Sequence, residues 1–173
     1  MRTTVLYKSK YGASARYASM LAEALGTEAQ ELDKAGAAAL SGCERAVFVG
    51  GVYAGGVAGL QKFAKLLSGC SVGRAAVLCV GASPYDEGAI AQLRGRCRAL
   101  DESVPLFYAR GAWDEEKMSL KDRTMCALLQ KMVAKRPPEE TEPWMRELLG
   151  ARGQKRDWVS GEYLTPLLEY MRG

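Results

Sequence analysis

The stretch TTVLYKSKYGAS at residues 3–14 decides the fold of this chain. Residues 3–7 have the pattern of a short strand that is buried on both faces, as in a parallel sheet covered by helices. A Gly/Ser loop follows at residues 9–14, and the Ala- and Leu-rich segment 13–25 predicts a helix that stops at Gly26. At such a turn, the free N–H groups and the positive end of the helix dipole point at one spot. The stretch therefore predicts a strand–helix unit with an anion site at its turn.

Further segments repeat this alternation of strand and helix along the chain. The additional strands are expected at residues 28–32 (the weakest), 46–49, 75–80 and 104–108. The additional helices are expected at residues 35–40, 57–67 and 86–100. This alternation predicts an α/β fold with a doubly wound parallel sheet of five strands and right-handed crossovers. The most economical strand order is 2-1-3-4-5.

The regular alternation stops after the fifth strand. Residues 111–157 are expected to form a helical insertion within a single domain that spans residues 1–173. The insertion contains a long helix at 117–136, the breaker Pro137-Pro138 and a short segment at 144–149. The last helix is expected to begin within residues 160–165, so that Pro166 falls in its first turn.

Composition excludes several classes of function. The chain of 173 residues contains no histidine, which excludes imidazole acid–base chemistry, Ser-His-Asp and Cys-His nucleophile systems and HExxH zinc sites. The simplest source of reactivity is then a bound cofactor. The net charge of +4 is spread along the chain without basic runs between aromatics, so no nucleic-acid partner is predicted.

The cysteines and the apolar runs bear on the cellular compartment. The five cysteines are odd in number and contain no CxxC pair, which predicts reduced thiols, with neither a disulfide framework nor a metal site. No apolar run approaches the roughly 18 residues of a membrane span, and the apolar start at residues 3–7 is too short for a secretion signal. A cytoplasmic location is therefore expected.

Two further loops lie at the carboxyl edge of the predicted sheet, where ligands bind in this class of fold. The loop at 50–56 combines glycines with Tyr53, and the loop at 81–85 combines small residues with Tyr85. Glycines allow a flat ligand to approach the backbone, and the tyrosines offer stacking faces. No Walker A loop, GxGxxG motif or receiver-type aspartate is present. The three loops together favour a phosphorylated planar heterocycle; the alternative is that residues 9–14 form only a well-capped turn.

These loops resemble those of the flavodoxin-like proteins, which bind FMN. SKYGAS is similar to their phosphate loop, commonly Thr/Ser-x-Thr-Gly-x-Thr/Ser, with Tyr11 in place of the usual Thr and Ala13 in place of the usual Asn. Trp113 is a further candidate to border the ring or the substrate, and Lys10 to assist the phosphate from outside. The candidate cofactor-binding residues are Ser9, Lys10, Tyr11, Gly12, Ala13, Ser14, Gly51, Val52, Tyr53, Ala54, Gly55, Ala82, Ser83, Pro84, Tyr85 and Trp113.

Within this group, the chain most resembles the menaquinone-dependent protoporphyrinogen oxidases. The resemblance rests on the Tyr of SKYG, on GGVYAGG before a helix with Phe63, and on the insertion that begins ARGAW at 109–113. It implies an FMN oxidoreductase that passes electrons from a substrate such as protoporphyrinogen to a quinone, with no catalytic side chain identified. One alternative is a one-electron carrier, a role that the +4 charge disfavours because such carriers are typically acidic. Another is a cofactor-free interaction module.

The helix expected at 117–136 is amphipathic and basic. Met125, Leu128, Leu129, Met132 and Val133 recur at helical spacing, with lysines and arginines between them. The favoured interpretation is that this stripe packs on the domain or on a second subunit in a homodimer. The alternative is peripheral contact with the inner face of the cell membrane, where the methionines would suit a quinone.

Overall fold

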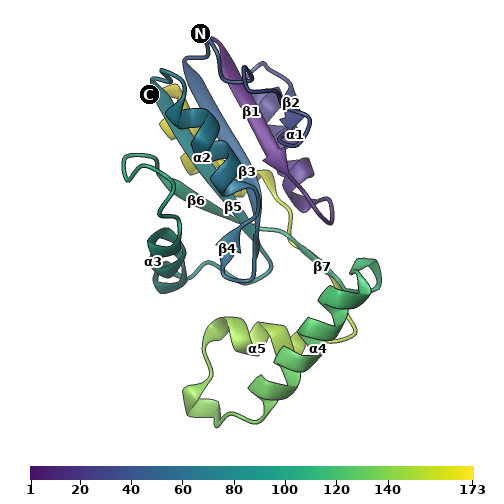
Figure 1. Cartoon of the computed structure of the whole chain (residues 1–173). Coiled ribbons are helices and arrows are strands. Elements are labelled where there is room, and N and C mark those ends of the chain that lie inside the picture. Colours follow the sequence, from purple (N-terminus) through teal and green to yellow (C-terminus); the bar gives the residue numbers. More distant parts are fainter.

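The computed structural model describes all residues 1–173, and a parallel sheet of five strands forms its centre (Figure 1). The strands lie in the order β2-β1-β3-β5-β6, and the short β4 pairs antiparallel with the end of β3. The predicted α/β class and the order 2-1-3-4-5 are confirmed, since β5 and β6 are the fourth and fifth parallel strands. The bounds are β1 Thr3–Lys8, β2 Ala29–Glu31, β3 Arg45–Tyr53, β4 Gly56–Val57, β5 Arg74–Gly81 and β6 Leu106–Arg110.

Helices cover both faces of the sheet. In Figure 1, α2 (Leu60–Ser68) lies in front of the sheet and α6 (Thr165–Arg172) lies behind it. Successive residues of β3 enter the two cores, because side chains alternate between the faces of a strand. Val47 packs in the core under α1 (Ala13–Ala24) and α6, whereas Phe48 stacks on Phe63 of α2 with ring centroids 5.0 Å apart.

Most of the predicted helices are confirmed, but one is wrong. Helix α1 ends before Gly26, whose φ of 65° suits the left-handed turn, and α3 (Glu87–Arg96) is capped by Asp86, which accepts from the Ala89 N–H at 2.6 Å. The helix predicted at 35–40 is absent, and residues 32–42 form turns. A helix of six residues that includes Gly36 is too short to offset the free-energy cost of helix nucleation. The segment still delivers the buried side chain of Leu40 to the core.

The segment predicted as a loop at 50–56 is a β-hairpin. Strand β3 continues to Tyr53, and Tyr53 pairs with Gly56 of β4. Ala54 (φ 50°) and Gly55 (φ 77°) both adopt the left-handed conformation, which matches the primed two-residue turns of hairpins. Helix α2 consequently begins at Leu60, three residues later than predicted, after Gly59 with its φ of 84°.

The predicted insertion is a distinct arm of the structure. Its two ends pair as β7 (Ala112–Asp114) and β8 (Lys155–Asp157), and between them lie α4 (Leu120–Ala134) and α5 (Pro143–Gly150), with 3₁₀ turns at Glu115–Lys117 and Pro138–Glu140. Figure 1 shows α4 and α5 standing beyond the carboxyl ends of the strands. The last helix, α6, follows a 3₁₀ turn at Gly161–Leu164 and carries a proline in its first turn, as expected. No helix has the length and apolarity that crossing a membrane requires.

Candidate functional site

The loop between β1 and α1 leaves several backbone donors free. Gly12 adopts a φ of 101° that favours glycine, and its N–H donates to Ser9 Oγ at 3.1 Å. The first backbone bond of α1 runs from the Arg16 N–H to the Gly12 carbonyl at 3.0 Å, and the N–H groups of residues 13–15 donate no hydrogen bond within the chain. These donors converge where the helix dipole is positive. The loop therefore has the construction of an anion site.

Ser14 adds a hydroxyl to these donors. Its side chain is buried, and its hydroxyl forms no hydrogen bond within the chain. Gly51 of β3 lies opposite, because a Cβ placed on Gly51 would stand 3.7 Å from Ser14 Oγ. The structure thus brings two of the predicted site residues together, and leaves a polar group between them that a ligand can satisfy.

Lys10, Tyr11 and Tyr53, which the sequence assigned to two separate loops, meet at a residue that was not predicted. The carboxylate of Asp122 accepts hydrogen bonds from the hydroxyls of Tyr11 and Tyr53, and its Oδ2 lies 2.5 Å from Lys10 Nζ. Lys10 Nζ also lies 4.8 Å from the centre of the Tyr53 ring. Asp122 belongs to α4, and its side chain is only 4 % exposed. We refer to Asp122 with Lys10, Tyr11 and Tyr53 as the Asp122 clasp.

The charges of the clasp balance one another. The Lys10 ammonium, and after it the hydroxyls of Tyr11 and Tyr53, hold the pKa of Asp122 well below its ordinary value. The same contact with Asp122 raises the pKa values of Lys10 and Tyr53. A carboxylate with a lowered pKa loses its charge only when the pH falls through that lowered value, so the clasp stays ionised at neutral pH. Lys10 is therefore engaged by Asp122 and is not a free cation for a phosphate.

The loop after β5 is anchored from β6. The hydroxyl of Tyr108 donates to the Ser83 carbonyl at 2.6 Å, and Arg110 Nε donates to the Ala82 carbonyl at 3.0 Å. Pro84 follows in the half-buried part of this loop, and the ring of Tyr85 is 64 % exposed. The loop thus has a fixed backbone and offers an open aromatic face at the same edge as the anion site.

Trp113 takes a different environment from the one expected. It lies in β7, paired with Arg156, and its side chain is buried at the base of the insertion. Its indole N–H is buried without a hydrogen-bond partner. Its predicted role beside the ring or the substrate stays a prediction.

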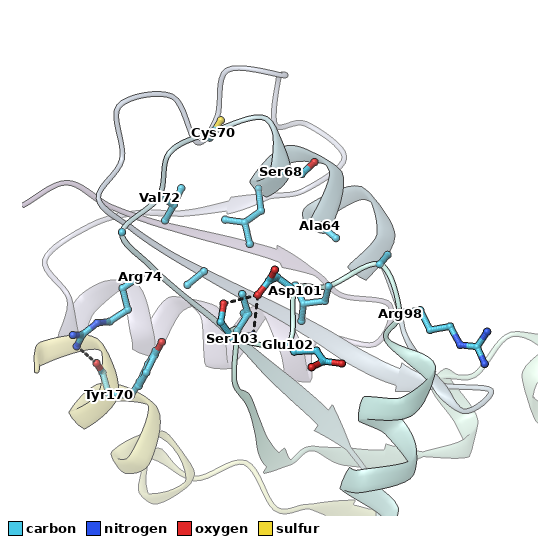
Figure 2. A pocket seen from close by; sticks show the side chains of 16 residues that line it. Ala64, Ser68, Cys70, Val72, Arg74, Arg98, Asp101, Glu102, Ser103 and Tyr170 are labelled. Carbon is cyan, nitrogen blue, oxygen red and sulfur yellow. Dashed lines mark hydrogen bonds between the residues drawn. The ribbon is translucent and has the colours of Figure 1, made fainter.

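A cavity of about 770 Å³ lies at the opposite edge of the sheet (Figure 2). Its lining comes from the end of α2, the start of β5 and residues 98–104, which precede β6. Asp101 accepts from Ser103 within its own turn, and Arg74 donates to the Tyr170 carbonyl. This cavity lies away from the carboxyl edge of the sheet, and none of the predicted site residues lines it.

A family comparison agrees with this geometry. The family model described as "Flavodoxin domain" matches residues 4–141. The chain belongs to the flavodoxin domain family. The family implies a flavin cofactor, typically FMN, and a flavin-linked redox function.

Two solved structures resemble this flavodoxin-domain protein. "The Structure of Trp Repressor Binding Protein from Bacillus subtilis" matches with 16 % identity and a TM-score of 0.47, over 64 % of this chain and 85 % of that one. "Structure of a flavodoxin from the domain Archaea" matches with 13 % identity and a TM-score of 0.45, over 73 % of this chain and 91 % of that one. No curated protein matches the sequence.

Proposed function

We propose that this flavodoxin-domain protein binds FMN at the carboxyl edge of its sheet and passes electrons from a small-molecule substrate to a quinone. The observation that carries the cofactor assignment is the set of unpaired donors at the start of α1. The N–H groups of residues 13–15 and the Ser14 hydroxyl have no partner within the chain. A phosphate oxygen satisfies such donors through charge-assisted hydrogen bonds.

The residues around these donors fit the rest of the cofactor. The phosphate would be held by residues 12–15, and the ring would lie between the hairpin that carries Tyr53 and the loop that carries Tyr85. When bound, FMN would supply reversible acceptance of electrons. The protein's part is to hold the phosphate, border the ring with aromatic faces and limit access of water.

Two features favour an enzyme over a one-electron carrier. The net charge of +4 differs from the acidic surfaces that steer carriers onto basic partners. The insertion also places an arm of about 47 residues beside the cofactor edge, which gives a substrate more surface than three loops alone. Protoporphyrinogen remains the candidate substrate on the resemblance described above, with menaquinone as the acceptor.

The cofactor assignment is tested by comparing FMN with riboflavin. We expect FMN to bind at least about 100-fold more tightly, because the phosphate forms several charge-assisted hydrogen bonds that riboflavin lacks. Flavin fluorescence quenching measures both affinities. Equal affinities, or no binding of either flavin, would contradict the proposal and favour a cofactor-free module. Reoxidation of the reduced, FMN-loaded protein by a menaquinone analogue then tests the acceptor.

We further propose that α4 contacts an anionic lipid surface. Met125, Leu128, Leu129 and Met132 are 44 %, 60 %, 39 % and 57 % exposed, so the expectation that this stripe packs on its own domain is wrong. Helix α4 buries the neighbouring side, which includes Asp122, Gln130 and Val133, because its N-terminal turn is held by the Asp122 clasp. The exposed stripe thus borders the buried side, since Leu129 and the buried Val133 are one helical turn apart.

The charges of α4 indicate which partner covers the exposed stripe. Its only carboxylate, Asp122, is buried and paired, whereas Lys121, Lys131 and Lys135 are exposed. Acidic residues resume only after Pro137-Pro138. An apolar stripe flanked by lysines matches the acyl and headgroup regions of an anionic bilayer. A lipid surface is also where a quinone acceptor is found.

Vesicle sedimentation tests the lipid contact. The wild-type protein should bind phosphatidylglycerol vesicles, and Lys131→Gln with Lys135→Gln should lower binding by about 30-fold, since each lysine near such a surface contributes about 1 kcal/mol. The matched control removes two basic charges from the body of the domain, at Lys65 and Arg98, and should leave binding unchanged. Equal losses in both variants, or a homodimer that forms through the Leu128 and Met132 face, would contradict the proposal.

A further inference from the structure

The insertion reaches the cofactor edge through the N-terminal turn of α4. Figure 1 shows the body of α4 away from the sheet. Its first turn, however, meets the loop after β1 and the end of β3. Ser119 N–H donates to the Tyr11 hydroxyl at 3.2 Å, and Asp122 binds Tyr11, Tyr53 and Lys10. The carboxylate is therefore a junction between three segments that are distant in the sequence.

We propose that Asp122 is a positioning residue of the flavin site, which holds Tyr11 and Tyr53 in place and thereby makes the insertion part of the cofactor site. The proposal rests on FMN as the cofactor. It assigns no chemical step to Asp122, whose carboxylate acts only through the groups that it binds.

The position of Tyr53 explains why it needs such support. Tyr53 ends β3 at the tip of a two-residue hairpin, and the next residue, Ala54, holds a φ of 50° that is unfavourable for a residue with a side chain. Its ring is 41 % exposed, so packing alone does not restrict it. The hydrogen bond from its hydroxyl to the buried Asp122 fixes the direction of the ring at the edge where the flavin would lie.

Within the loop between β1 and α1, Tyr11 contacts the insertion, whereas other residues provide the anion donors. Its hydroxyl donates to Asp122 and accepts from the Ser119 N–H, so it faces the insertion. The anion donors of the loop are instead the backbone N–H groups of residues 13–15 and the Ser14 hydroxyl. Replacement of the usual Thr by Tyr11 therefore exchanges a phosphate contact for a contact with the insertion.

An opposing interpretation is that the Asp122 carboxylate only weakens FMN binding by repelling the phosphate.

Two variants distinguish this repulsion from a positioning role of Asp122. Asp122→Asn removes the charge and frees Lys10, whereas Tyr53→Phe removes one hydrogen bond and leaves every charge in place. If Asp122 acts through the tyrosines, both variants should release FMN faster, by about tenfold each. The double variant should release it no faster than Asp122→Asn alone, because the two residues act through one contact.

Three measurements on the full-length chain test the proposal. Stopped-flow measures the release of FMN, visible circular dichroism reports the orientation of the bound ring, and amide hydrogen exchange of the FMN-free protein reports the clasp itself. We expect both variants to change the dichroism, and Asp122→Asn to speed exchange in residues 9–14 and 120–124 by about tenfold. Glu139→Gln, an exposed carboxylate of the insertion without a partner, is the matched control and should change nothing.

Failure of the positioning role of Asp122 can be distinguished from failure of the proposed FMN binding. Tighter FMN binding by Asp122→Asn, with no change in Tyr53→Phe, would overturn the positioning role in favour of repulsion. Unchanged hydrogen exchange in Asp122→Asn would overturn the clasp whether or not FMN binds. If the wild-type protein binds no FMN, the proposed function fails, and the positioning role falls with it, while faster exchange would still show that the clasp joins the insertion to the domain.

Discussion

Ser14→Asp is expected to weaken FMN binding by at least about 100-fold while the protein remains folded. The new carboxylate would stand at the start of α1. There it would accept hydrogen bonds from the free N–H groups that would otherwise donate to the phosphate. The new carboxylate would also repel the phosphate. The Coulomb energy of two unit charges 4 Å apart is about 4 kcal/mol at an effective dielectric constant of 20. Fluorescence titration measures the affinity, and circular dichroism the fold.

Two controls separate charge from position in this experiment. Ser14→Ala removes only the hydroxyl and should cost about tenfold in affinity. Ser41→Asp makes the same change of charge in an exposed turn before β3, at the amino edge of the sheet, and should leave FMN binding unchanged. An unchanged affinity in Ser14→Asp would show that the phosphate does not bind at the start of α1.

Gly50→Ala is expected to destabilise the fold by about 3 kcal/mol, whereas Gly51→Ala leaves the free energy of unfolding nearly unchanged. A Cβ on Gly50 would stand 2.7 Å from Val57 Cγ1 and 2.8 Å from the Ala58 carbonyl oxygen, so the β3–β4 hairpin would have to shift. A Cβ on Gly51 would meet nothing closer than Ser14 Oγ at 3.7 Å. Urea denaturation of the two variants measures the difference.

This pair of glycines also tests why the segment is rich in glycine. One possible reason is that glycines allow a flat ligand to approach the backbone closely. The other is that β4 and the residues after it pack closely on β3. The contacts assign the second reason to Gly50, because the atoms that crowd it belong to the protein. Equal stability of Gly50→Ala and the wild-type protein would show that the hairpin adjusts freely, contrary to these contacts.

The candidate site could be predicted from the sequence in part. The turn with free N–H groups between β1 and α1 was predicted because a strand, a Gly/Ser turn and a helix start follow one another directly at residues 3–14. The hairpin at 53–56 was missed, because two residues of β4 are too few to show a strand pattern. Asp122 was missed as well. Its only local signal was an acidic residue three positions after Ser119, which reads as an ordinary first turn of a helix.

The exposed stripe of α4 shows the limit of the same reasoning. Spacing grouped Val133 with Met125, Leu128, Leu129 and Met132, and such a stripe usually faces a core. In the structure, Val133 is buried while the other four are exposed. Periodicity identifies an apolar face, but the side on which a helix packs depends on what holds its ends.

The amino-acid sequence by itself determined the alternation of strands and helices and the turn at residues 9–14 that leaves N–H groups free. These features follow from contacts between near neighbours: buried strand patterns, helix ends and a turn that exposes N–H groups. Only the tertiary structure decided the Asp122 clasp and the exposed face of α4. The pairs Tyr11–Asp122 and Tyr53–Asp122 are separated by 111 and 69 residues. They meet because β7 and β8 pair at the base of the insertion and place the first turn of α4 over the carboxyl edge of the sheet.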